Sequence, residues 1–297
     1  MRQLLAIQGH GSFAKAARAL GMSQPSLSAA MARLEDQLKV ALFERSAQGS
    51  QLTPVGELMA ERARRVIAET EQMIRDAALM AGGEAGEIRV GLGSYLVQNF
   101  LPRFVRRLAE AHPSLSVNFD VLDRSRLMPL LKGRELDLII CAMGDDVMAE
   151  GLVATEVFTT QAVAVASPDH PLAGEGPVSM ERFASFPSAG SSMRRFNNAA
   201  VLGPGSLEGR LLQYQSSAAE PLLELALSGV ATWICPLFVA QPYLADGRLK
   251  RIEVELDYRV SYAAISTRAA STSPIVSRVV RLATAVGETM RAEAGEL

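Results

Sequence analysis

The sequence predicts an α/β protein built from a small helical N-terminal domain, one long connecting helix and a larger C-terminal α/β domain. Short helical patterns divided by glycines extend to about Leu38. No glycine or proline occurs between Gly56 and Gly82, which predicts one long helix. Strand and helix patterns then alternate. At 297 residues the chain is longer than one hydrophobic core usually supports, so we expect more than one domain.

The composition is that of a globular protein, because 48% of the residues are hydrophobic and 21% are charged. Cys141 and Cys235 lie in apolar stretches, which indicates buried thiols and not a disulfide framework. The region after Met1 lacks a signal-peptide pattern, and the longest near-apolar run, Val230 to Ala240, is too short to span a bilayer. We therefore expect a cytoplasmic protein with no membrane partner.

The N-terminal region has the spacing of short helices joined by tight turns. A first helix around Leu4 to Ile7 ends at the following glycines, and Ser12 can cap a second helix that Gly21 closes. Ser23 can cap a third helix that extends to about Leu38. Its apolar residues recur at spacings of four, three and four, which predicts one buried face: Leu27, Met31, Leu34 and Leu38.

Small polar side chains at the start of this third helix suit entry into the major groove of DNA, where free backbone N–H groups also favour phosphate. Gln24 is the best candidate for reading a base, since its amide can pair with adenine. The expected DNA contacts on this helix are Ser23, Gln24, Pro25, Ser26, Ser28 and Arg33.

A two-stranded wing is predicted after this helix, from Phe43–Arg45 and Gln51–Thr53, with Gly49 in the turn. Arg45 is expected at a phosphate, and Gln48 and Ser50 complete the expected DNA contacts. The first 53 residues hold six basic and three acidic side chains, which is compatible with DNA binding. A small helical bundle with polar caps has the same spacing, and spacing alone does not separate the two interpretations.

The N-terminal region also carries a series of motifs without a gap: Gly11-Ser12-Phe13, Ala16-Ala17, Leu20, Ser23-Gln24-Pro25, Ser28, Leu34-Glu35, Leu42-Phe43-Glu44-Arg45 and Leu52-Thr53-Pro54-Val55-Gly56. With this set it resembles the LysR-type transcriptional regulators. The resemblance implies a winged helix-turn-helix domain over residues 1–53 that binds double-stranded promoter DNA, and a regulator that acts with RNA polymerase.

Two positions depart from the family pattern. Lys39 stands where the family usually has glycine, so a residue with a β-carbon is expected in a left-handed conformation, at a cost of about 1 kcal/mol. Ala29 and Ala30 stand where relatives often carry polar or basic side chains. Affinity or sequence preference for DNA is therefore expected to differ from that of relatives.

The connecting helix is expected over residues 54–82, capped by Thr53 and about 42 Å long. Small and apolar residues alternate along it at spacings of four and three, as in a coiled-coil seam: Met59, Ala63, Val66, Thr70, Met73, Ala77 and Met80. Such a face can also pack against its own domain. Its position between domains and the two-fold symmetry of half-site recognition favour dimerisation, so we expect a homodimer or homotetramer.

The C-terminal region begins with a βαβαβ series, which predicts a parallel sheet. Its expected segments are Ile88–Gly91, Gln98–His112, Leu115–Leu122, Leu127–Leu131 and Leu136–Ala142. A strand pair around Leu152–Ala166, strands at Val230–Cys235 and Val260–Ser266, and a closing helix over Pro274–Met290 follow.

Gly91-Leu92-Gly93 follows the first of these strands and invites comparison with a dinucleotide-binding loop. Leu96 replaces the third glycine that such loops use for close packing, so we interpret this segment as a ligand loop and expect no cofactor. Ligands of open α/β sheets bind beyond the carboxyl ends of strands, which points to Ser94, Tyr95 and Met143.

The family resemblance extends more loosely over this region, through Leu101-Pro102, His112-Pro113, Leu136-Asp137-Leu138, His170-Pro171-Leu172 and Gly247-Arg248-Leu249. It implies a two-lobed effector-binding domain of the type II periplasmic-binding-protein kind over residues 87–297. Lobe I is expected at about 87–160 and 267–297 and lobe II at about 161–266, with crossings near Thr160 and Ser266.

The same resemblance implies a small-molecule effector in a cleft lined by Ser94, Tyr95, Met143, Ser216, Ser217 and Trp233. Hydroxyls such as those of Ser94 and Ser217 suit a carboxylate effector. Arg194 and Arg195 are interpreted as solvated surface charges and not as an anion clamp.

Catalytic motifs are absent from the sequence. The three histidines are scattered singly, no Cys or carboxylate cluster has metal-ligand spacing, and neither Gly-x-Ser-x-Gly nor a P-loop occurs. We therefore expect no enzyme and no metal site. The competing classes are a solute-binding protein and a dinucleotide-dependent oxidoreductase, the latter on fold alone.

Overall fold

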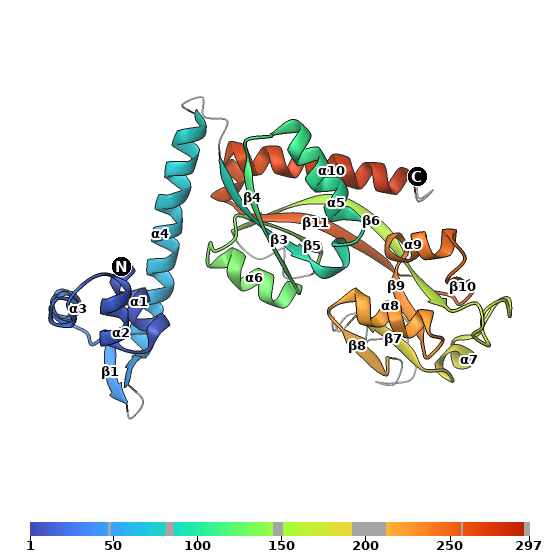
Figure 1. The fold of residues 1–297 in the computed structure, drawn as a ribbon, viewed down its shortest axis with the longest axis horizontal. Coiled ribbons are helices and arrows are strands. Elements are labelled where there is room, and N and C mark those ends of the chain that lie inside the picture. The colour runs from blue at the N-terminus through green and yellow to red at the C-terminus, as the bar shows by residue number, and fades with distance from the viewer. Residues whose placement is uncertain (47–48, 81–85, 145–150, 192–211, 257, 294–297) are drawn as a thin grey trace. The chain divides into compact units, whose positions relative to one another are not determined.

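The computed structural model describes residues 1–46, 49–80, 86–144, 151–191, 212–256 and 258–293. The chain forms two compact units, the first comprising residues 1–83 with the short segment 132–135 and the second the remaining residues (Figure 1). Each unit is described by itself below.

Three helices form the N-terminal domain: α1 (Arg2–His10), α2 (Phe13–Ala19) and α3 (Gln24–Leu38). Ser23 caps α3 as predicted, since its side chain accepts a hydrogen bond from the Ser26 N–H at 3.2 Å. Helices and wing share one core, made of Leu4, Ile7, Ala16, Ala17, Leu27, Met31 and Leu42 together with two alanines of the connecting helix. The prediction was wrong for Leu38, whose side chain is 38% exposed because α3 extends past this core.

Lys39 ends α3 in the left-handed conformation, with φ 57° and ψ 30°, which confirms the expectation from its position. Its N–H caps the helix by donating to the Glu35 carbonyl. The Lys39 ammonium lies 2.8 Å from the Asp36 carboxylate, but this exposed pair adds little stability.

Replacing Lys39 with glycine is expected to raise the free energy of unfolding by about 0.5–1 kcal/mol, because glycine adopts this conformation without strain but loses more entropy on folding. Urea unfolding of the full chain measures the change. Lys39→Ala, which keeps the β-carbon, is the matched control and gives no gain. A loss of stability with Lys39→Gly contradicts the strain assigned to this position.

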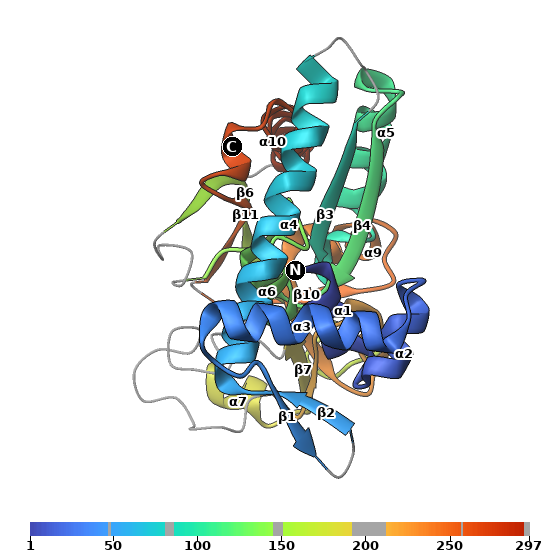
Figure 2. The same cartoon turned by 90° about the vertical axis from the view of Figure 1, so that its left-hand side faces the viewer.

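The wing consists of β1 (Phe43–Ser46) and β2 (Gly49–Leu52), paired antiparallel with Phe43 opposite Leu52 and Ser46 opposite Gly49. Figure 2 shows it projecting below α3. Thr53 lies just beyond β2 and not within the strand, and its hydroxyl caps the next helix as predicted by accepting from the Gly56 N–H at 3.0 Å. The same hydroxyl donates to the Ala41 carbonyl at 2.8 Å.

Glu35 joins α3 to the wing. Its carboxylate accepts hydrogen bonds from the backbone N–H groups of Leu42 at 2.6 Å and Phe43 at 3.1 Å. A charged acceptor shared by two backbone donors fixes the wing relative to the third helix.

The connecting helix α4 (Pro54–Met80) has the predicted position and uninterrupted length. Ala63, which is buried, and Met59, which packs beside it, belong to the core of the N-terminal domain. The predicted seam is therefore wrong at its start, because these two residues cover their own domain. Further along, the side chains of Val66 and Met73 are 48% and 64% exposed.

The second unit opens with the predicted βαβαβ series, formed by β3 (Glu87–Gly93), α5 (Phe100–Ala111), β4 (Ser116–Leu122), α6 (Arg124–Lys132) and β5 (Leu138–Ala142). β3 pairs in parallel with both β4 and β5. Helices α5 and α10 (Pro274–Glu293) cover one face of this sheet and α6 the other (Figure 1).

Gly91 is required by packing within this sheet. A Cβ there would lie 2.5 Å from Leu127 Cδ2 and 2.7 Å from Leu136 Cδ1. This close approach of α6 to β3 explains the glycine without a phosphate-binding loop.

β6 (Leu152–Ala166) is one strand, so the predicted strand pair was wrong. Its first part pairs antiparallel with β11 (Arg259–Thr267), and its last part pairs with β9 (Thr232–Pro236) and β10 (Lys250–Ile252). β11 also pairs with β5, and its pairing with β6 ends at Arg259 opposite Gln161. The return crossing expected near Ser266 therefore lies nearer Arg259.

The two long strands β6 and β11 connect two lobes, as the family resemblance implied. The second lobe contains β7 (Ser188–Ser191), β8 (Tyr214–Ser216), α7 (Met180–Ala184), α8 (Ala219–Leu227) and α9 (Leu237–Ala245) beside β9 and β10. The strand order across both lobes is β4-β3-β5-β11-β6-β9-β7-β8. Short helices η1 (Ser94–Leu96) and η3 (Ala270–Thr272) follow β3 and β11.

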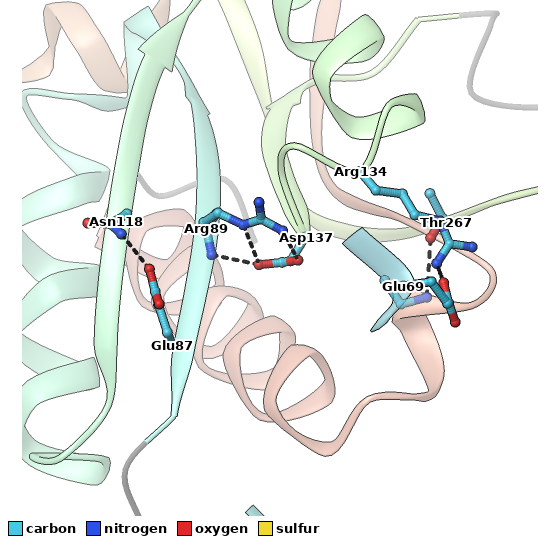
Figure 3. Close-up of polar contacts among 8 residues, drawn as sticks. Glu69, Glu87, Arg89, Asn118, Arg134, Asp137 and Thr267 are labelled. Carbon is cyan, nitrogen blue, oxygen red and sulfur yellow. Dashed lines mark hydrogen bonds and ion pairs between the residues drawn. The ribbon is translucent and has the colours of Figure 1, made fainter. Parts of the chain in front are cut away.

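Arg89 and Asp137 link neighbouring strands of the first lobe (Figure 3). The Asp137 carboxylate accepts from the Arg89 backbone N–H at 2.8 Å and from its guanidinium at 3.1 Å. In return, the Asp137 N–H donates to the Arg89 carbonyl at 2.9 Å. These bonds fix the register in which β5 starts beside β3.

Candidate nucleic-acid interface and ligand site

The start of α3 presents exposed polar side chains. Gln24 and Ser28 are exposed and lie four residues apart, so they share one face of the helix, and Pro25 and Ser26 are exposed beside them. The Ser23 and Ser26 hydroxyls lie 2.7 Å apart and also form the helix cap. Ser23 and Ser26 therefore hold the helix start in shape, and Gln24 and Ser28 keep free surface for a partner.

The remaining predicted DNA contacts are less closely grouped. Arg33 is exposed, but it comes nine residues after Gln24, which at about 100° per residue is the opposite side of the helix. Ser50 is half-buried on the wing. Gln48 and the side chain of Arg45 lie outside the described residues.

Residues from both lobes meet at what we name the lobe junction, defined by Ser94, Tyr95, Ser217 and Trp233. The Ser94 hydroxyl at the start of η1 donates a hydrogen bond to the Ser217 carbonyl. The rings of Tyr95 and Trp233 lie 6.5 Å apart between centroids. The sequence separations of 123 residues for Ser94–Ser217 and 138 for Tyr95–Trp233 show that the fold brings these pairs together.

Two further hydrogen bonds join the lobes beside the junction. The Asn99 side-chain amide donates to the Phe238 carbonyl at 2.9 Å. The Tyr243 hydroxyl donates to Gln98 Oε1 at 3.5 Å. The lobes are thus held by polar contacts that can form and break, and not only by the continuous strands.

Two polar atoms at the lobe junction lack partners. In the described part of the chain, neither the buried Tyr95 hydroxyl nor the indole Nε1 of the fully buried Trp233 makes a hydrogen bond of normal geometry, although the indole lies close enough to the hydroxyl to lower its pKa. Burial raises the pKa of Tyr95 well above its usual value, so the hydroxyl is neutral and can donate. The indole N–H is a donor only. A buried donor without a partner is costly, so both atoms suit an acceptor on a ligand.

The other residues of the predicted cleft are placed differently. Met143 is 42% exposed just after β5, and no described contact joins it to the lobe junction. The Ser216 hydroxyl accepts from the Ala218 N–H at 3.0 Å and so shapes the turn after β8. Arg194 and Arg195 lie outside the described residues.

Sequence reasoning missed Ser191, which is buried at the end of β7. Burial raises the pKa of Tyr95, whereas the nearby Trp233 indole and the Ser191 hydroxyl lower it by hydrogen bonding to the charged form. The sequence did offer one signal for this residue, because Ser191 carries a hydroxyl directly after Gly190 at the end of a strand. The strand is only four residues long and was not recognised.

Metal ligands do not cluster in the described ranges, where no group of three His, Cys, Asp or Glu side chains could hold an ion. His170 has a structural role, since its Nδ1 accepts from the Leu172 N–H at 3.2 Å. Burial lowers the pKa of His170. Of the helices that the structure describes, none is both long and apolar enough to cross a membrane.

Comparison with known proteins gave matches to two family models. Residues 1–57 match the model described as bacterial regulatory helix-turn-helix protein, lysR family. Residues 81–288 match the LysR substrate binding domain. The chain is also 28% identical over 280 residues to the SDS degradation transcriptional activation protein of Pseudomonas sp. (strain ATCC 19151), covering 92% of this chain and 91% of that protein.

Solved structures with the same fold include two full-length regulators. One is LysG from Corynebacterium glutamicum with bound effector Arg, with a TM-score of 0.63, 19% identity and coverage of 97% of this chain and 96% of that one. The other is CbnR complexed with its target DNA, with a TM-score of 0.55, 20% identity and coverage of 96% and 98%.

Proposed function

The chain belongs to the LysR family of bacterial transcriptional regulators, and we propose that it reads promoter DNA with the start of α3 while a small molecule at the lobe junction modulates that binding. As a family member it has a helix-turn-helix DNA-binding domain and an effector-binding domain. The observation that carries the effector part is the pair of unpartnered buried donors, Tyr95 Oη and Trp233 Nε1.

The DNA-binding role assigned to α3 rests on its capped start and on the exposed side chains beside it. Gln24 reads a base edge in this proposal, and Ser28 contacts the neighbouring base or phosphate. Arg45, on β1 of the wing, contacts a phosphate. The related CbnR has been solved with its target DNA, which supports a regulator of this fold acting on duplex DNA.

Gln24→Ala is expected to cost about 1–3 kcal/mol of binding free energy on the preferred operator and nothing on duplexes mutated at the base pair that it reads. Arg45→Ala weakens binding to all duplexes alike, because phosphates carry no sequence information. Fluorescence anisotropy with an operator selected from random duplexes, and with its single-base-pair variants, measures both. Equal losses on every duplex from both changes contradict the assigned roles.

The effector is proposed to present an acceptor oxygen, as a carboxylate does, to Tyr95 and Trp233. Such a ligand satisfies both donors in a buried setting where hydrogen bonds are strong. The hydrogen bond from Ser94 to Ser217 lies beside them and responds to any movement of one lobe against the other. LysG is described with bound effector Arg, an amino acid, which supports this chemical class by analogy.

Tyr95→Phe tests this assignment because it removes the unpartnered hydroxyl and keeps the ring. The free energy of unfolding without ligand stays equal or rises, whereas effector affinity falls about tenfold. A thermal-shift screen of carboxylates and amino acids supplies the effector, and isothermal titration measures affinity. Tyr214→Phe, on the exposed edge strand β8, is the control. A Tyr95→Phe variant that loses stability and keeps full affinity contradicts the proposal.

Several further roles belong to the same proposal. The exposed later part of α4, with Val66, Met73 and Ala77, forms part of a two-fold interface in a homodimer or homotetramer. The regulator acts in the cytoplasm, where it meets promoter DNA and RNA polymerase. Its action is binding and not catalysis.

A further inference from the structure

A buried histidine lies in the turn that follows β6, which we name the His170 turn and define as residues 167–173. His170 is 6% exposed, so its imidazole is almost completely removed from water. The imidazole Nδ1 accepts a hydrogen bond from the N–H of Leu172, which is also buried. The main chain closes the same turn, since the His170 N–H donates to the Ser167 carbonyl at 3.0 Å and the Ala173 N–H donates to the His170 carbonyl at 2.8 Å. The turn therefore depends on the imidazole as well as on the backbone.

The hydrogen bond from Leu172 exists in only one protonation state of His170. A neutral imidazole has one N–H and one bare nitrogen, and in this turn Nδ1 is the bare nitrogen. A protonated imidazole has two N–H groups and no acceptor. Uptake of a proton would place two donors against each other and leave the buried Leu172 N–H without a partner. The closed turn is consequently compatible only with neutral His170.

The surroundings do not offset a positive charge on His170. Its ring packs edge-to-face against the Phe186 ring, with 5.1 Å between centroids. The Arg182 guanidinium lies over the Phe186 ring and pairs with Glu175 through two hydrogen bonds of 3.2 Å. Charged side chains also lie on the elements around the turn, and all of them are exposed: Asp169 and Glu175 in or after the turn, Glu181 and Arg182 on α7, Glu220 and Glu224 on α8, and Lys250 and Arg251 on β10. Within the described residues, burial lowers the pKa of His170, and no charged group contributes to the shift.

The His170 turn contacts two elements that reach the lobe junction. On one side, the Ser167 N–H donates to the Ala226 carbonyl at 3.1 Å near the end of α8, the helix that begins beside the lobe junction. On the other side, the ring that packs on the imidazole is followed in the chain by Pro187. The Pro187 carbonyl accepts from the Thr232 N–H at 2.9 Å, at the start of β9. The next residue of β9 is Trp233, so a rearrangement of the turn acts on both α8 and β9.

We infer that the His170 turn is a pH-sensitive switch in the second lobe, in which proton uptake by His170 opens the turn and loosens α8 and β9 beside the lobe junction. In the opened turn the imidazole returns to the ordinary histidine pKa of about 6.5, whereas in the closed turn its pKa is lower. The opened form therefore binds the proton more tightly. The closed turn keeps its full stability above about pH 6.5 and loses stability as the pH falls below that value. This switch acts on the fold of the second lobe and needs no bound effector.

Hydrogen–deuterium exchange of the full chain between pH 7.5 and pH 5.5, corrected for the intrinsic exchange rate at each pH, measures this opening. In the wild type the opening constant of residues 167–186 rises by up to about tenfold over this range, as the linkage to one proton requires. Peptides from α8 and β9 show the same pH dependence, because they open together with the turn. Peptides from α5, in the first lobe, show no comparable rise.

His170→Asn separates the proton from the hydrogen bond. The Asn side-chain oxygen can accept from the N–H two residues on, as in an Asx turn, but it takes up no proton in this range. The variant therefore folds and its second lobe stays closed down to pH 5.5. His170→Ala removes the acceptor, so this segment opens more than the wild type at pH 7.5 and no longer responds to pH. His112→Asn, at the end of α5, is the matched control and keeps the wild-type pH dependence.

Two results would overturn the pH-sensitive switch. One is a wild-type His170 turn whose opening constant is the same at pH 7.5 and pH 5.5. The other is a His170→Asn variant that opens in acid as the wild type does. Acid opening that is confined to residues 167–173 and leaves α8 and β9 unchanged contradicts the connection to the lobe junction.

Discussion

Gly56→Ala is expected to destabilise the N-terminal domain by about 3 kcal/mol or more and to abolish DNA binding. A Cβ at Gly56 would lie 2.1 Å from the Leu42 carbonyl oxygen and 3.0 Å from Leu52 Cδ2. The Leu42 carbonyl already accepts from the Thr53 N–H at 3.0 Å, so it cannot move without opening the junction between the wing and α4. Urea unfolding and operator anisotropy measure the two effects.

Gly9→Ala is the matched control for this substitution. A Cβ at Gly9 meets nothing within 4 Å, and the residue lies in α1. Alanine has the higher helix propensity, so stability rises by up to about 1 kcal/mol and operator affinity is unchanged. Wild-type stability in Gly56→Ala would show that α4 does not pack on the wing as closely as described.

Asp137→Ala is expected to lower the free energy of unfolding by about 3–5 kcal/mol, the cost of breaking a buried charge pair from one side. Asp137 is 6% exposed, and its loss removes the acceptor for the Arg89 backbone N–H and for the half-buried guanidinium. Urea unfolding of the full chain, evaluated at the transition of the effector-binding domain, measures the change.

Glu87→Ala provides the control, on β3, the strand that carries Arg89. Glu87 is exposed and accepts from the Asn118 side chain at 2.9 Å (Figure 3), so its removal changes stability by no more than about 0.5 kcal/mol. Similar costs for the two substitutions would mean that the Arg89–Asp137 pair is not what fixes β5 beside β3.

Local signals in the sequence predicted the N-terminal helices well. The Ser23 cap and the left-handed Lys39 both follow from residue type and position, and the structure has both. The βαβαβ series was also predictable, because its strands and helices alternate with short connections.

The single long strand β6 could not be predicted, since polar residues in its middle interrupt the apolar pattern. The structure accommodates them by cross-strand bonding, because the Thr159 hydroxyl lies 2.7 Å from the Ser261 hydroxyl on β11. Thr160 is buried beside it. An interpretation based on the apolar pattern of strands assigns such a polar segment to a turn between two strands.

The apolar seam on α4 shows a second limit of prediction from the sequence. A sequence pattern shows that one face is apolar but not what covers it, and Met59 and Ala63 pack in their own domain. The lobe junction shows a third limit of prediction from the sequence. Tyr95 and Trp233 come together only through the topology of the whole domain. Tyr95 could be selected from its position after the first strand, whereas the selection of Trp233 depended on family resemblance.

The central claim is that this chain is a sequence-specific DNA-binding regulator whose affinity responds to a ligand in its C-terminal domain. The most direct test is anisotropy of the full chain on its selected operator and on a scrambled duplex at one salt concentration, with and without the effector found by thermal shift. We predict affinity for the operator at least about 10³-fold above that for the scrambled duplex, and a change of about 5–150-fold with effector. Equal affinity for both duplexes, unaffected by any ligand that stabilises the protein, would contradict the account.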